Sequence, residues 1–132
     1  VSAGDEASLR KAVEQEPNRA DALVPLARLL HARGDDDEAL ALLERVPGDF
    51  GGAGLAARIA LQRAGEPDLT DAFAALDEGD DERALDLLLA ALPSADGARD
   101  DIRKVVVGVL DALGVEHPLA RDARRRLAAA LY

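Results

Sequence analysis

The chain has 132 residues and a net charge of −10, from 26 acidic and 16 basic side chains. Because so acidic a protein repels nucleic-acid phosphate and anionic membranes, we expect protein partners, with no nucleic acid and no membrane among them. The chain contains no cysteine, which excludes thiol redox chemistry, disulfides and thiolate metal sites within it.

The composition is typical of a helical protein. Ala and Leu together supply 50 residues, and only three side chains are aromatic. Ala and Leu are strong helix formers, whereas strands favour β-branched and aromatic residues. We therefore predict an all-α protein, and the spacing of its apolar residues indicates about eight helices.

The first third of the chain predicts two helices. One ends before Pro17, and Asn18 is suited to cap the next, over residues 18–33. The apolar residues of this second helix recur at the spacing of one helical face: Leu23, Leu26, Ala27 and Leu30. Pro25 lies inside it and removes a backbone hydrogen bond at a cost of about 3 kcal/mol, so we expect a kink or a later start.

Residues 34–43 and 79–88 repeat one pattern, in which Gly-Asp is followed by acidic residues and then by Ala and Leu. The glycine suits the left-handed residue that ends one helix, and the aspartate can cap the next. Each segment therefore predicts a tight helix–turn–helix. Ala39 and Ala84 fall where a small side chain lets two antiparallel helices approach closely.

The remaining elements alternate breaks and helices. We predict a loop over residues 47–54, which are rich in glycine. Further helices are predicted at 55–63, 69–76, 82–92 and 102–113, and from Pro118 to the chain end. The last of them carries a ridge of apolar residues four positions apart: Leu119, Ala123, Leu127 and Leu131.

The pattern of the first third resembles one tetratricopeptide repeat, a helix pair of about 34 residues. The matching residues are Leu23, Leu26, Ala27, Leu30, Gly34, Asp35, Ala39, Leu43 and Val46. The resemblance weakens further along, because Gly34 and Gly79 lie 45 positions apart. It implies a right-handed α-solenoid of antiparallel helix pairs stacked on their neighbours. The last two helices would cap this row, and its concave face would hold a peptide or a helix.

The end of the chain, at residues 110–119 and 124–132, resembles the closing helix pair of the chaperedoxins, which are thioredoxin-like co-chaperones. The resemblance implies that residues 1–132 form one tetratricopeptide domain, from the C-terminal part of a longer protein. It also implies that the domain binds partly unfolded client proteins or a chaperonin, with the last helix as the docking element. The family's thioredoxin domain and cysteine motif are absent from this sequence, so no oxidoreductase activity is assigned to it.

The candidate partner-binding residues lie in the last helix and combine a basic cluster with an apolar ridge. They are Arg121, Arg124, Arg125, Leu127, Leu131 and Tyr132, and Arg126 extends the cluster. On one interpretation the arginines contact an acidic partner; on the other they interact with the carbonyl end of their own helix. Tyr132 distinguishes the two, since a ring packed near Val109 or Leu113 belongs to the core, whereas an exposed ring anchors a partner.

The sequence offers no constellation for catalysis, for a cofactor or for a metal. His31 and His117 have no second ligand at a metal-binding spacing and are expected at the surface. The acidic run at 35–38 lacks the pattern of a calcium loop and is interpreted as helix capping. No serine or threonine has a histidine placed to activate it. We therefore predict that the chain is not an enzyme.

Two alternatives to a protein-binding module stay open. A structural or oligomerising repeat segment would have a filled groove and no affinity for peptides. An enzyme would need a polar pocket with perturbed titrating groups. The oligomeric state is open between a monomer and a weak dimer. Because the sequence has neither a bilayer-spanning apolar stretch nor a signal peptide, we expect a cytoplasmic location.

Overall fold

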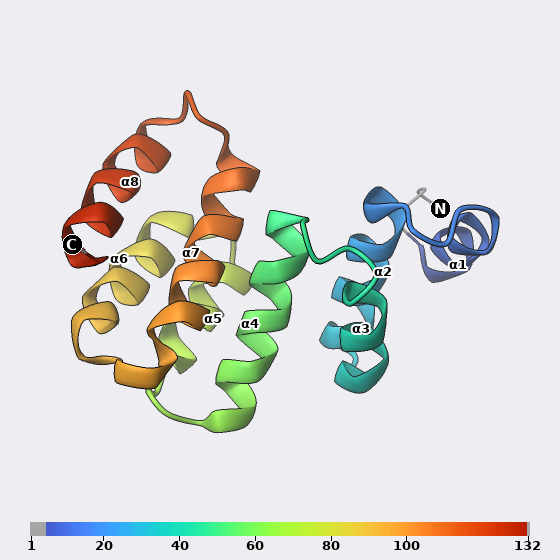
Figure 1. Ribbon diagram of the computed structural model, residues 1–132, viewed down its shortest axis with the longest axis horizontal. Coiled ribbons are helices and arrows are strands. Elements are labelled where there is room, and N and C mark those ends of the chain that lie inside the picture. The colour runs from blue at the N-terminus through green and yellow to red at the C-terminus, as the bar shows by residue number, and fades with distance from the viewer. Residues whose placement is uncertain (1–4, 132) are drawn as a thin grey trace.

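A computed structural model describes residues 5–131, which form helices and no strand (Figure 1). The helices are α1 (Glu6–Gln15), α2 (Ala20–Ala32), α3 (Asp36–Leu43), α4 (Phe50–Ala64), α5 (Thr70–Asp77), α6 (Asp81–Ala91), α7 (Arg99–Leu113) and α8 (Pro118–Leu131). Two short 3-10 helices, η1 (Leu92–Ser94) and η2 (Asp96–Ala98), lie between α6 and α7. The prediction of an all-α fold with about eight helices is confirmed for this part of the chain.

The two repeated Gly-Asp segments form the same turn. Gly34 and Gly79 have φ angles of +92° and +79°, in the left-handed region that a glycine adopts without strain. Asp80 also caps α6, since its carboxylate accepts a hydrogen bond from the Arg83 N–H at 3.2 Å, whereas Asp35 makes no such bond. Both segments are therefore helix–turn–helix units, as predicted.

Helix α2 begins two residues later than the sequence predicts. Its N-cap is Arg19, which makes no side-chain capping bond, so the prediction that Asn18 caps this helix is wrong. Pro25 still lies inside the helix. The helix persists because its other face is completely buried, and each buried leucine contributes roughly 1.5–3 kcal/mol. The fully buried leucines of α2 are Leu23, Leu26 and Leu30.

The predicted loop at residues 47–54 is wrong in its second half, because α4 already begins at Phe50. Asp49 caps this helix, and its carboxylate accepts a hydrogen bond from the Gly52 N–H at 2.7 Å. Glycines within the helix serve close packing instead of breaking it. A Cβ on Gly54 would lie 3.2 Å from the backbone oxygen of Lys104 in α7.

The buried apolar residues form two clusters that meet in α4. Leu55 and Ile59 belong to the N-terminal cluster, with residues of α1, α2 and α3. Ala57 and Leu61 belong to the C-terminal cluster, with residues of α5, α6, α7 and α8. Because one continuous helix contributes to both cores, α4 couples the two halves of the fold.

The order of the helices in space departs from their order in the chain after α4. Helix α7 packs along α4, and the α5–α6 hairpin and α8 lie beyond (Figure 1). Ile102 and Val106 of α7 are fully buried, so α7 is an interior helix. The predicted cap of two helices is therefore reduced to α8, which packs on α6 and α7.

Candidate functional site

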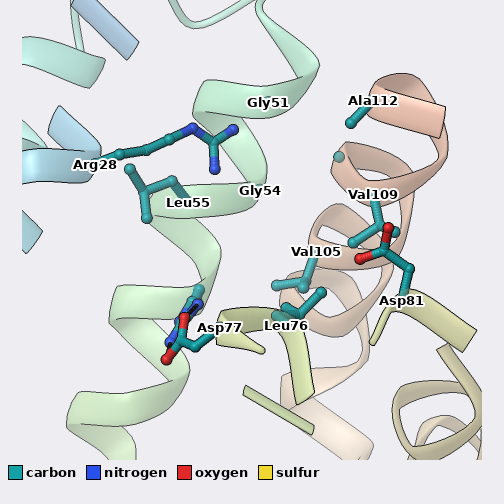
Figure 2. A pocket seen from close by; sticks show the side chains of 12 residues that line it. Arg28, Gly51, Gly54, Leu55, Leu76, Asp77, Asp81, Val105, Val109 and Ala112 are labelled. Atoms are coloured by element: carbon teal, nitrogen blue, oxygen red, sulfur yellow. Dashed lines mark hydrogen bonds and ion pairs between the residues drawn. The ribbon is translucent and has the colours of Figure 1, made fainter. Parts of the chain in front are cut away.

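A groove of about 230 Å³ opens between α4 and α7 and is bordered by α2, α5 and α6 (Figure 2). Its lining includes the side chains of Leu55, Leu76, Val105 and Val109. Gly51, Gly54 and Gly108 also belong to the lining, and at Gly54 and Gly108 the two helices are in close contact. The groove therefore offers an apolar floor into which a partner's side chain could pack.

The groove is closed at one side by an ion pair between α4 and α5. The Arg58 guanidinium donates two hydrogen bonds of 2.8 Å to the two carboxylate oxygens of Asp77. Its carbon Cζ also lies 5.0 Å from the centre of the Phe73 ring, a cation–π contact. Only 13% of the Arg58 side chain is exposed, so this arginine is held firmly in the wall.

The Arg58–Asp77 pair makes stability depend on pH. The hydrogen bonds from Arg58 hold the pKa of the Asp77 carboxyl below its ordinary value. Stabilisation is therefore complete above the unfolded-state pKa of about 3.9 and is lost as the pH falls through the lower folded-state pKa.

We expect Asp77→Asn to lower the free energy of unfolding by up to about 1 kcal/mol at pH 7, because the carboxylate is largely exposed and its pair is screened. The difference from wild type should shrink toward zero at strongly acidic pH. Urea unfolding at several pH values measures it. Asp71→Asn, at an exposed acid of the same helix, is the control. A difference that does not change with pH would contradict the assignment of this stabilisation to the carboxylate's charge.

The two histidines have structural roles. His31 is half-buried, and its Nδ1 lies 2.6 Å from an Asp36 carboxylate oxygen, so its predicted place at the surface is wrong. Asp36 is the first residue of α3, so this contact links the end of α2 to the start of α3. His117 is also half-buried and precedes α8, where its Nδ1 accepts a hydrogen bond of 3.1 Å from the Leu119 N–H.

Replacing His117 tests this cap. We expect His117→Ala to lower the free energy of unfolding by about 1 kcal/mol, because a backbone N–H of the first turn loses its acceptor. His117→Asp should restore or exceed the wild-type stability, since aspartate caps well and faces the positive helix end. Urea unfolding of the three proteins at pH 7 measures both effects. Equal destabilisation by alanine and aspartate would contradict a capping role.

The acidic run at 35–38 links helices. Asp37 pairs with Arg63 of α4 at 2.7 Å, and Glu38 pairs with Arg10 of α1 at 2.9 Å. These carboxylates thus serve helix packing as well as the first turn of α3. Within residues 5–131, no group of three or more His, Cys, Asp or Glu residues is placed to hold a metal ion.

The predicted partner-binding arginines lie on α8, away from the groove. Arg121 pairs with Glu116 at 2.9 Å, Arg125 contacts Asp122 at 3.5 Å, and Arg124 is half-buried. None of them lies in the last turn of α8. The carbonyl end of this helix is instead met by Arg99 of α7, which donates to the Ala130 oxygen at 3.0 Å. The interpretation that these arginines interact with the carbonyl end of α8 is therefore wrong.

Most of the predicted apolar ridge of α8 packs against the core of the domain. Leu127 and Leu131 are half-buried and pack against the C-terminal core. The most deeply buried positions of this helix are Ala120 and Ala123, so the inner face includes the ridge residue Ala123 and extends to Ala120, which the sequence pattern did not indicate. Tyr132 lies outside the described residues, and its role as an anchor stays a prediction.

The residues of the groove were not identified from the sequence. Their signal is weak, since Gly51, Gly54 and Gly108 look like helix breakers in a sequence without its fold. Their position becomes meaningful only when α7 is known to lie against α4, a contact that brings together Gly54 and Gly108, 54 positions apart in the chain. No local pattern contains that information.

Comparison with known families supplies the classification. Residues 53–132, more than half of the chain, match a tetratricopeptide-repeat family model. The chain belongs to the tetratricopeptide-repeat family. A second tetratricopeptide-repeat model matches residues 6–64, so the two matches overlap within α4, the helix that the two cores share. No curated protein and no solved structure matches the chain.

Membership of the tetratricopeptide-repeat family indicates a protein–protein interaction module, and the family is typically non-catalytic. The groove agrees with this role, because it combines an apolar floor with charged residues at its border. No helix within residues 5–131 is long and apolar enough to cross a membrane.

Proposed function

We propose that this tetratricopeptide domain binds partly unfolded client proteins or a chaperonin, as the C-terminal, non-catalytic part of a thioredoxin-like co-chaperone in the cytoplasm. The observation that carries the proposal is the open groove between α4 and α7. A purely structural scaffold would have this space filled. Unfolded chains expose apolar side chains, and an apolar floor of this size accommodates them.

The basic face of α8 supports a second contact. Four arginines, Arg121, Arg124, Arg125 and Arg126, lie on this helix of an otherwise acidic chain. Arg121 and Arg125 pair only with exposed acids of the same chain; such exposed pairs are weak, so both arginines can turn to an acidic surface on a chaperonin. The groove then holds clients, and α8 together with the predicted anchor Tyr132 docks the domain.

The groove is tested by aggregation of a denatured reporter protein in the presence of the full chain. Wild type should suppress light scattering, and Ala112→Glu should weaken the suppression several-fold, because Ala112 lines the groove and is exposed. Ala90→Glu is the matched control, since Ala90 is exposed on α6 away from the groove. Equal suppression by both variants would overturn the assignment of the groove to clients.

The docking role of α8 is tested by binding to a purified chaperonin. Arg121→Glu combined with Arg125→Glu should weaken binding about ten-fold or more, because like charges would then face each other. Arg45→Glu combined with Arg83→Glu changes the net charge equally at exposed sites elsewhere and should retain most of the binding. Equal losses in the two double variants would reduce the effect to net charge and contradict docking through α8.

A further inference from the structure

Two charged side chains at the border of the groove have no ion-pair partner within residues 5–131. Arg28 reaches the groove from α2, and Asp81 reaches it from the first turn of α6 (Figure 2). The other two charged residues of the lining, Arg58 and Asp77, neutralise each other. The free charges of the groove are therefore one positive and one negative group, carried by different helices.

The positive side of the groove is formed by Arg28, beside the start of α4. A Cβ on Gly51 would lie 3.3 Å from Nη2 of Arg28, so the guanidinium lies beside the first turn of this helix. The N-terminal end of a helix carries partial positive charge. Asp49 caps this helix end through the Gly52 N–H and keeps its own negative charge there, but it makes no ion pair with Arg28. An acidic group of a partner would thus meet the guanidinium of Arg28.

The negative side is formed by Asp81. It is half-buried, and its carboxylate points from α6 toward the groove beside Val109 (Figure 2). Removing a carboxylate partly from water without a cation costs free energy, which a basic group of a bound partner would return. Between the two charges lie the apolar side chains of Leu55, Val105 and Val109.

The size of the groove selects the kind of occupant. Its volume of about 230 Å³ is below the roughly 300 Å³ at which pockets for small molecules begin. Gly54 and Gly108 let α4 and α7 approach each other closely, since a Cβ on either would meet the backbone of the facing helix. The groove therefore lies over a close contact between two helices. A few apolar side chains fit this space better than a cofactor does.

We propose that the groove selects a peptide segment in which apolar side chains are flanked by an acidic residue on one side and a basic residue on the other. The acidic residue pairs with Arg28, and the basic residue pairs with Asp81. This inference rests on the proposed function of the groove and specifies the client segments that it holds. It also gives the bound segment a direction, because exchanging the two flanks would place like charges together.

The test uses short fluorescent peptides with two central leucines. The neutral parent peptide has glutamine on both flanks of the leucines. Three further kinds of peptide replace one glutamine by glutamate, the other by lysine, or both. Each is made in two versions, with the acidic flank on the N-terminal or on the C-terminal side. Fluorescence anisotropy measures their affinity for wild type, for Arg28→Gln and for Asp81→Asn. Both substitutions are nearly isosteric, and circular dichroism with urea unfolding verifies that the variants are folded.

In one chain direction, the acidic flank should raise the affinity for wild type about three-fold, and the basic flank by a similar factor, as expected for partly exposed ion pairs. Arg28→Gln should abolish the gain from glutamate and leave the gain from lysine. Asp81→Asn should do the reverse. This crossed pattern supports the proposal, since a general loss of stability would lower all affinities together.

Other outcomes separate this inference from the function on which it rests. One outcome is that peptides bind equally well whatever their flanking residues, while Ala112→Glu still weakens the suppression of aggregation. This outcome would overturn the inference and leave the proposed function standing. If no peptide binds, and Ala112→Glu suppresses aggregation as well as wild type does, both the inference and the proposed function are overturned. A dimer in sedimentation that Ala112→Glu dissociates would assign the groove to a second copy of this chain and likewise overturn the inference.

Discussion

Replacing Leu88 by alanine is expected to lower the free energy of unfolding by about 2–5 kcal/mol, because a leucine in a core leaves a cavity that its neighbours fill only partly. Leu88 is fully buried on α6, at the centre of the C-terminal core. For a domain of this size such a loss is a large part of the total stability. Urea or thermal unfolding followed by circular dichroism measures the change.

Leu29→Ala is the matched control for that experiment. It makes the same chemical change on α2, at a side chain that is 39% exposed, and should cost less than about 0.5 kcal/mol. If the two substitutions cost the same, the packing of the C-terminal core would be looser than the structure indicates.

The Leu88 variant also tests the coupling of the two cores. Because α4 contributes to both, the loss of packing in the C-terminal core should lower the midpoint of one common transition. Two separate transitions, with only the later residues destabilised, would contradict a single cooperative unit. In that case α4 would have to remain folded with one core alone.

The parts of the fold that follow from the sequence are those determined locally. The two Gly-Asp turns were predictable because a left-handed glycine, an N-terminal acid and the following Ala-Leu pattern lie within ten residues. Pro118 at the start of α8 and Gly114 at the end of α7 are equally local signals, and both were predicted correctly. Such features depend on backbone conformation and require no knowledge of distant neighbours.

The parts that did not follow depend on contacts between distant segments. Residues 50–54 were predicted as a loop because glycine disfavours helices, whereas Gly54 lies in α4 at the point where the backbone of α7 comes closest. The inner face of α8 was predicted at Ala123, Leu127 and Leu131, which do meet the C-terminal core, but the ridge pattern omitted Ala120, which is fully buried. The groove exists only through these contacts, so its residues stayed unidentified.

The second large effect is expected for Gly108→Val. A Cβ at this position would lie 3.1 Å from the backbone oxygen of Phe50 and 3.4 Å from Cα of Gly54. Both contacts are with the backbone of α4, so no side chain can turn aside to make room. The two helices would have to separate, at a cost of about 1–3 kcal/mol for overpacking.

The sign of the change in unfolding free energy distinguishes a steric conflict between the helices from the effect of helix propensity. Valine is the better helix former by a few tenths of a kcal/mol, so a change without steric conflict would stabilise α7 slightly. Gly48→Val is the control, because a Cβ on Gly48 meets no atom within 4 Å. Urea unfolding should show a loss for position 108 and almost none for position 48. A stabilised Gly108→Val protein would refute the close contact between α4 and α7.

The same variant connects stability to function. Separation of α4 from α7 would widen the groove, because Gly108 and Gly54 line it together with the apolar floor. We therefore expect Gly108→Val to weaken binding of the neutral two-leucine peptide even at a temperature and urea concentration where the protein stays folded. Leu88→Ala, which lies outside the lining, should retain that affinity under conditions where it too is folded. A loss of affinity in both variants alike would attribute binding to overall stability, whereas a selective loss at position 108 would attribute it to the distance between the two helices.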